Sequence, residues 1–137
     1  MAVTTLEAHD GVQLLRPHER AAIEIAVAQW VGSERCASAA KEQLRALGEC
    51  DGDIERYRRA DAADPALRAL LRFSITILIA RGRVDPRDVR RLRPRPSDAV
   101  LAEAAAVVAR AYLRVTLVES LDIDLHTPPL AMAIGDY

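Results

Sequence analysis

Residues 21–48, AAIEIAVAQWVGSERCASAAKEQLRALG, decide the fold that the sequence predicts. The first half is apolar on nearly every face, and the second half begins after Gly32 and Ser33, so the stretch is typical of two helices joined by a tight turn. Gly32 has no Cβ and can end the first helix in a left-handed conformation, while Ser33 can accept hydrogen bonds from the free N–H groups of the second. The stretch therefore predicts a helical hairpin with Cys36 in the first turn of its second helix.

Cys36 is the first candidate functional residue. A thiol near the third position of a helix lies in the positive field of the helix N-terminus, which favours the reactive thiolate. The same position also suits a buried cysteine that only fills space in the core, which is the commoner role of a lone cysteine. Both interpretations are open at this point.

Start and stop signals along the rest of the chain predict further helices. The first helix of the hairpin is expected to run from Pro17 to Val31. Four more are expected at 51–59, with Asp51 or Asp53 as the cap, and at 65–82, 86–92 and 98–121, where two Asp-Pro pairs and Ser97 supply the start signals. The predicted fold class is therefore all-α, a bundle of about six helices. It forms one domain over residues 16–125, between an N-terminal arm (1–15) and a C-terminal tail (126–137).

Two further expectations concern burial. The segment 73–80, FSITILIA, is apolar on every face apart from hydroxyls, and its length and caps favour a buried central helix over a strand. In the last helix Glu103, Arg110 and Arg114 share one stripe, which is expected to face solvent or another subunit.

Glu24 is the second candidate functional residue, because it and Gln29 are the only polar side chains between Ala21 and Val31. Desolvation would raise the pKa of its carboxyl group and make it a candidate general base. The alternative is a Glu24 that reaches solvent or pairs with an arginine.

Composition narrows the class of protein. Half of the 137 residues are apolar, which is enough for one sizeable core, and the net charge of −1 gives no case for nucleic acid. The arginine-rich run at 80–98 is interrupted by Asp85, Asp88 and Asp98 and contains no aromatic residue, so it is interpreted as a solvated surface. No stretch is long and apolar enough to span a membrane, and the N-terminus lacks the pattern of a signal peptide, so a cytoplasmic protein is expected.

The cysteines and histidines indicate neither a disulfide nor a metal site. Cys36 and Cys50 are expected at opposite ends of one helix, roughly 20 Å apart at 1.5 Å per residue, beyond disulfide reach. His126 is alone in the tail, and the chain contains no Cys/His cluster. The sequence therefore predicts no zinc and no cofactor.

The run from Arg16 to Asp53, followed by residues 65–113, resembles the carboxymuconolactone decarboxylase and alkylhydroperoxidase D (AhpD-like) superfamily. In that family an apolar helix and a tight turn lead into C-x-x-C-x-x-x-H, on a helix that ends in Leu-Gly. Aligning the motif on Leu47-Gly48 places its three residues at Ser33, Cys36 and Ala40. The acidic residue that the peroxidase members carry one helix earlier falls at Ala21. Only Cys36 of these groups is present.

The resemblance implies an AhpD-like protomer that forms a trimer or hexamer, and the apolar residues 130–134 of the tail also suit association. It leaves three function classes. The first is an oligomeric protein without the two-cysteine peroxidase activity, which binds a small molecule or a partner protein in a pocket near Ser33, Ala40 and Ala21. The second is a peroxiredoxin-type antioxidant that uses Cys36 with an external thiol, because Ser33 cannot form a disulfide. The third is a cofactor-free decarboxylase or isomerase with Glu24 as base. The alanines at the positions of the acid and the base favour the first class.

Overall fold

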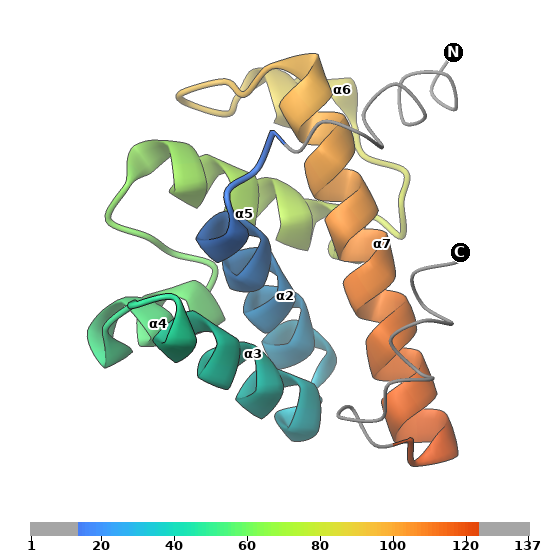
Figure 1. Cartoon of the computed structure of the whole chain (residues 1–137). Coiled ribbons are helices and arrows are strands. Elements are labelled where there is room, and N and C mark those ends of the chain that lie inside the picture. The colour runs from blue at the N-terminus through green and yellow to red at the C-terminus, as the bar shows by residue number, and fades with distance from the viewer. Residues whose placement is uncertain (1–13, 124–137) are drawn as a thin grey trace.

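The computed structural model describes residues 14–123, and these residues form an all-helical bundle (Figure 1). Its six helices are, in chain order, α2 (Pro17–Val31), α3 (Glu34–Ala46), α4 (Asp51–Arg58), α5 (Pro65–Ile79), α6 (Pro86–Arg90) and α7 (Asp98–Leu121). The predicted fold class, an all-α bundle of about six helices, is confirmed.

Most of the helix ends, at both termini, follow the predicted local signals. Gly32 ends α2 with a φ of 95°, a left-handed conformation that glycine adopts without steric strain. The Ser33 hydroxyl caps α3 by accepting a hydrogen bond from the backbone N–H of Cys36 at 3.2 Å. Asp64 and Ser97 cap α5 and α7 in the same way. Short-range capping therefore fixes where these helices begin.

The bounds of three helices differ from the prediction. Cys50, rather than Asp51 or Asp53, occupies the N-cap of α4, and its side chain makes no capping hydrogen bond. The Cys50 thiol instead donates to the Asp53 carboxylate at 3.2 Å. Asp51 is the first helical residue, where its charge meets the positive end of the helix. α5 and α6 end at Ile79 and Arg90, a few residues earlier than expected.

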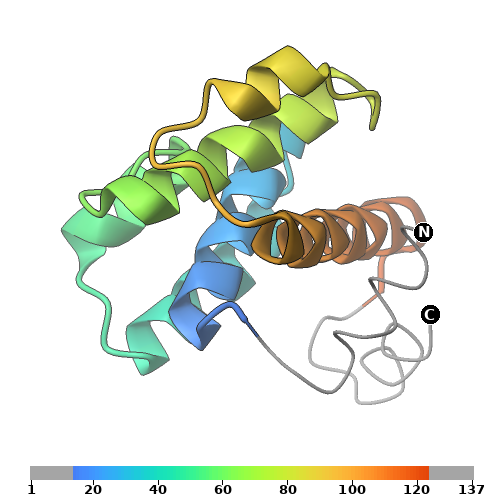
Figure 2. The ribbon, with the colours of Figure 1, turned by 90° about the horizontal axis from the view of Figure 1, so that it is seen from above.

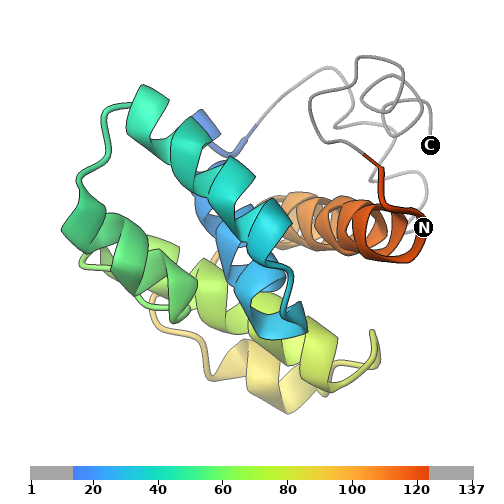
Figure 3. The same ribbon diagram turned by 90° about the horizontal axis from the view of Figure 1, so that it is seen from below.

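α2 is the central helix of the bundle. α3, α4, α5 and α7 all pack against it, as the views from above and below show (Figures 2 and 3). Its buried residues are Ala21, Ala22, Ile23, Ile25, Ala26, Val27 and Ala28. This apolar helix is thus largely buried, and its burial holds the 21–48 hairpin in the core.

α5 is buried only in part, contrary to the prediction for 73–80. Phe73 and Ser74 are buried, but Ile75 to Leu78 are half-buried and Ile79 is 64% exposed. The expectation of a fully buried central helix is wrong here, because the helices that pack on α5 leave its last turn open to solvent.

Glu103 is buried, so the expectation that its stripe of α7 faces solvent is wrong at this position. Its Oε2 accepts hydrogen bonds from the backbone N–H groups of Leu14 at 2.7 Å and Leu15 at 3.0 Å. Its Oε1 pairs with the guanidinium group of Arg20 on α2. Leu15, which the sequence assigned to the N-terminal arm, is part of the core. One carboxylate therefore holds the segment before α2, and α2 itself, against α7.

Within residues 14–123 no helix has the length and apolar character needed to cross a membrane. The first thirteen residues of the predicted arm lie outside the described residues. So do His126 and the apolar residues 130–134 of the tail.

Candidate functional site

The turn between α2 and α3 places Cys36 and Ser33 side by side in the core. Cys36 is 6% exposed and Ser33 is 2% exposed. The Ser33 hydroxyl accepts from the Cys36 backbone and donates to Oε1 of Glu119 on α7 at 2.6 Å. Within the described part of the chain the Cys36 Sγ has no hydrogen-bond partner and stays a free thiol. The hydroxyl thus acts as donor and acceptor at once, whereas among the described residues no hydrogen bond links the thiol to an acid or a base.

Sequence reasoning missed two residues at this site, Glu119 and Arg35. The Arg35 Nη2 donates to the backbone carbonyl of Val118 at 2.8 Å, and its Nε lies 3.8 Å from Oε1 of Glu119. More than eighty positions separate these groups in the chain, so no local pattern links them. One signal was present: Glu119 lies in the last turn of α7, where a negative charge opposes the helix dipole and is stabilised only by a partner elsewhere.

Glu24 lies at the interface of α2 and α7, away from the Cys36 thiol. Its Oε2 is 3.5 Å from Nη1 of Arg114, and its side chain is 25% exposed. Burial raises the pKa of the Glu24 carboxyl group, while the nearby Arg114 and Arg20 lower it. Glu24 is thus paired with an arginine, as in the second interpretation, and burial also raises the pKa of its carboxyl group, as the first interpretation expects. The structure does not bring the two candidate catalytic residues, Glu24 and Cys36, into hydrogen-bond contact.

Ala21 and Ala40, the positions at which the resemblance places an acid and a base, are both buried core residues. Ala21 is part of the packed face of α2, and Ala40 lies one turn after Cys36 on the buried side of α3. Neither side chain can transfer a proton. These two positions therefore offer the thiol no proton relay.

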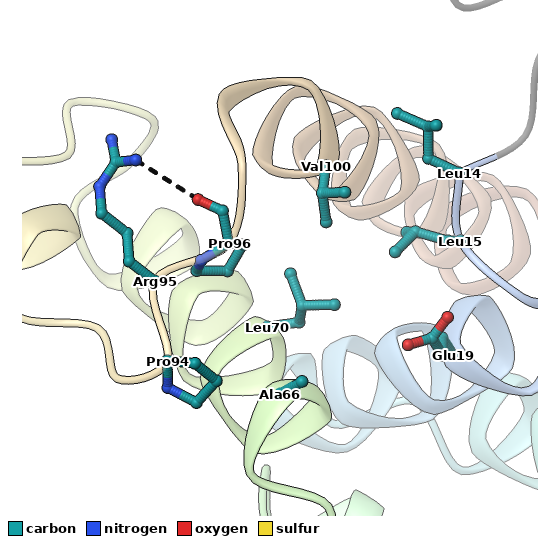
Figure 4. Close-up of a pocket in the computed structure, with 9 residues that line it drawn as sticks. All are labelled: Leu14, Leu15, Glu19, Ala66, Leu70, Pro94, Arg95, Pro96 and Val100. Atoms are coloured by element: carbon teal, nitrogen blue, oxygen red, sulfur yellow. Dashed lines mark hydrogen bonds between the residues drawn. The ribbon is translucent and has the colours of Figure 1, made fainter.

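A pocket of about 300 Å³ lies at the opposite end of α2 (Figure 4). It is formed by the first turns of α2, α5 and α7, the segment before α2 and the loop before α7. Its lining residues are Leu14, Leu15, Glu19, Ala66, Leu70, Pro94, Arg95, Pro96 and Val100. Seven of these nine side chains are apolar, so the hollow is mainly hydrophobic.

The two charged residues at the pocket already have partners. Glu19 Oε1 accepts the backbone N–H of Arg16 at 2.8 Å, which caps the start of α2. The Arg95 guanidinium group points away from the hollow (Figure 4). Its Nη2 lies 3.0 Å from Oδ1 of Asp98. Glu19 lies in the first turn of α2, and Ser33 follows its last turn. At 1.5 Å per residue the pocket is therefore roughly 20 Å from Cys36. The structure therefore does not place this pocket at the predicted site.

No group of three or more His, Cys, Asp or Glu side chains within residues 14–123 is arranged to hold a metal ion. Comparison of the whole chain with protein-family models, with curated proteins and with solved structures gives no match.

Proposed function

We propose that this chain is a divergent carboxymuconolactone decarboxylase/AhpD-like protein that binds a small apolar molecule and has no two-cysteine peroxidase activity. The pocket between the first turns of α2, α5 and α7 carries the proposal. Its volume of about 300 Å³ lies at the lower end of the range typical of small-molecule sites, and its walls are mainly apolar. Because Glu19 and Arg95 already have partners, the pocket suits a neutral ligand.

The surroundings of Cys36 support the absence of peroxidase chemistry. Efficient peroxide reduction needs an accessible thiolate, a proton donor for the leaving oxygen and a thiol that resolves the sulfenic acid. Cys36 is buried, Ala40 and Ala21 supply no proton, and the Ser33 hydroxyl cannot form a disulfide. The two enzymatic alternatives, an antioxidant that uses Cys36 with an external thiol and a decarboxylase or isomerase with Glu24 as base, lack comparable support.

Binding of a neutral fluorescent probe such as N-phenyl-1-naphthylamine tests the pocket. Ala66 lines the hollow but is exposed, so Ala66→Trp fills the hollow without disturbing the core. Ala63→Trp is the matched control, because Ala63 is exposed, precedes the same helix and does not line the pocket. We expect saturable binding at one site per chain, weakened at least about tenfold by Ala66→Trp and unchanged by Ala63→Trp. Equal binding by both variants would rule out this pocket.

Oxidation by a stoichiometric hydroperoxide tests the other half of the proposal. Cys50 is exposed and serves as the internal reference, and the masses of the two cysteine-containing peptides after cleavage show which thiol is oxidised. We expect Cys36 to be oxidised no faster than Cys50. Preferential and rapid oxidation of Cys36 at neutral pH would instead support the antioxidant alternative. The same proposal includes the trimer or hexamer that the family resemblance implies. Light scattering measures the mass in solution, which is compared with the protomer mass of 15.0 kDa.

A further inference from the structure

The pocket at the first turns of α2, α5 and α7 has one polar side chain that faces the hollow, that of Glu19. Figure 4 shows its carboxylate beside Leu15, on the side of the hollow opposite Arg95. The Arg95 guanidinium group points away from the hollow, and the other lining side chains are apolar. A molecule in this pocket therefore meets apolar walls and a single carboxylate.

Only one of the two carboxylate oxygens of Glu19 is engaged. Its Oε1 accepts the backbone N–H of Arg16 at 2.8 Å. Within residues 14–123, Oε2 makes no hydrogen bond and the side chain forms no ion pair. An ionised carboxylate accepts hydrogen bonds and cannot donate them. The free oxygen of Glu19 is therefore an acceptor that a ligand can use if it carries a donor.

The charges around the pocket are already balanced. Glu19, Asp64 and Asp98 lie at the starts of α2, α5 and α7, where a carboxylate meets the positive end of a helix. Asp98 also pairs with Arg95 at 3.0 Å. A charged ligand would lose its hydration in a mainly apolar hollow without finding a free opposite charge. The pocket therefore suits a donor that has no net charge.

We propose that the pocket selects a neutral apolar molecule with a hydroxyl group, an alcohol or a phenol, and that Oε2 of Glu19 accepts the hydrogen bond from this hydroxyl. The inference rests on the proposed function and names the class of its ligand. A hydrogen bond to a charged acceptor is stronger than one between neutral groups. An apolar ligand without a donor would displace water from Oε2 and leave this oxygen unpaired. The walls thus provide affinity, and Glu19 provides specificity.

Four naphthalenes that differ in one substituent test this selection. 2-Naphthol carries the donor, and its methyl ether lacks it. At neutral pH, 2-naphthoate is an anion and 2-naphthylmethylamine is a cation. Equilibrium dialysis gives the dissociation constant of each compound with the native chain. Ala66→Trp, which fills the hollow, and its control Ala63→Trp show whether the compounds bind in this pocket.

Glu19→Gln tests the assigned oxygen. The glutamine carbonyl can keep the hydrogen bond from the Arg16 N–H, which turns the amide NH₂ group toward the hollow. The variant thus retains the contact at the start of α2 and replaces the free acceptor with a donor. Glu34→Gln is the matched control, because Glu34 is exposed in the first turn of α3 and does not line the pocket. Circular dichroism confirms that both variants fold.

We expect both charged compounds to bind the native chain more weakly than 2-naphthol does. The preference for the hydroxyl is the dissociation constant of the methyl ether divided by that of 2-naphthol. Comparing this ratio between variants removes the difference in hydrophobicity of the two compounds. The ratio should fall at least about tenfold in Glu19→Gln and stay unchanged in Glu34→Gln. The anion should bind Glu19→Gln more tightly than the native chain, because a donor then faces its carboxylate.

The results separate a failure of this inference from a failure of the proposed function. A ratio that Glu19→Gln leaves unchanged, or tighter binding of the anion or the cation than of 2-naphthol to the native chain, would overturn the inference alone. The apolar pocket would then stand without the hydroxyl preference. Binding that Ala66→Trp does not weaken, or no saturable binding of any of the four compounds, would contradict the proposed function and this inference with it.

Discussion

The hydroxyl of Ser33 lies 2.6 Å from Oε1 of Glu119 and connects the first turn of α3 to the last turn of α7. The same oxygen accepts the backbone N–H of Cys36, so it acts as helix cap and interhelical donor at once. The family resemblance places the first cysteine of a redox pair at this position. In this chain the position has a structural role, which is a further reason to separate the fold from the redox chemistry.

Replacing Ser33 by alanine should therefore cost more than the loss of an ordinary cap. Ser33→Ala removes a buried cap of α3 and the hydroxyl that donates to the exposed Glu119, and we expect a loss of about 2 kcal/mol in the free energy of unfolding. Ser97→Ala is the control, because Ser97 caps α7 at an exposed position and should cost about 1 kcal/mol. Urea denaturation compares the two. Equal losses would mean that the contact with Glu119 contributes nothing.

Structural features that depend on residues close in sequence can be predicted from the sequence, and features that depend on residues far apart in the chain cannot. Gly32, Ser33 and the Asp64-Pro65 pair fix helix ends through groups a few residues away, so the sequence predicts these ends correctly. The burial of Glu103 depends on the N–H groups of Leu14 and Leu15, almost ninety residues earlier, and no periodicity in α7 reveals it.

The candidate site was only partly predictable for the same reason. The cap at Ser33 and the position of Cys36 in the first turn of α3 follow from local sequence. The ion pair of Glu24 with Arg114, the approach of Glu119 and the pocket at the start of α2 depend on how three helices meet. They become visible only once the bundle is assembled.

Removing the Glu103 carboxylate should destabilise the chain strongly. Glu103→Ala leaves two backbone N–H groups and the Arg20 guanidinium group without their acceptor. We expect the free energy of unfolding to fall by about 4 kcal/mol. Asp88→Ala, which breaks the exposed ion pair with Arg91, should cost less than about 1 kcal/mol and serves as the control. Chemical denaturation measures both. A small loss for Glu103→Ala would show that water replaces the carboxylate.

The stability contributed by Glu24 should depend on pH. Burial raises the pKa of its carboxyl group above the ordinary 4.5, so the folded chain binds a proton there more tightly than the unfolded chain does. This contribution is present below the ordinary pKa and is lost as pH rises through the folded-state pKa. We therefore expect Glu24→Gln to gain stability relative to the native chain between about pH 4 and pH 7. Urea denaturation across this range is the measurement, with Glu42→Gln on the exposed face of α3 as control. The opposite trend would mean that the pair with Arg114 outweighs burial.

Tyr57 should ionise only at strongly alkaline pH. Burial and the nearby Glu49 and Asp53 raise the pKa of its phenol to about 12. The stability linked to the neutral phenol is present below the ordinary pKa of 10.0 and is lost as pH rises toward about 12. Absorbance at alkaline pH should show a late component that Tyr57→Phe removes. The same variant loses the 3.3 Å hydrogen bond to Glu49, at a cost of about 1 kcal/mol near neutral pH. A late component that persists in Tyr57→Phe would assign it to another residue.

Introducing a histidine at Ala40, where the resemblance places that of the family motif, should damage the fold without producing peroxidase activity. Ala40 is 5% exposed on the packed side of α3, so Ala40→His forces an imidazole into a filled core and we expect a loss of about 3 kcal/mol. Ser38→His, at an exposed position of the same helix, should cost less than about 0.5 kcal/mol. Thermal denaturation and hydroperoxide consumption are measured on both variants. A stable Ala40→His variant in which hydroperoxide oxidises Cys36 rapidly would show that the core has room for the proton donor. The missing histidine alone would then explain why the native chain lacks peroxidase chemistry.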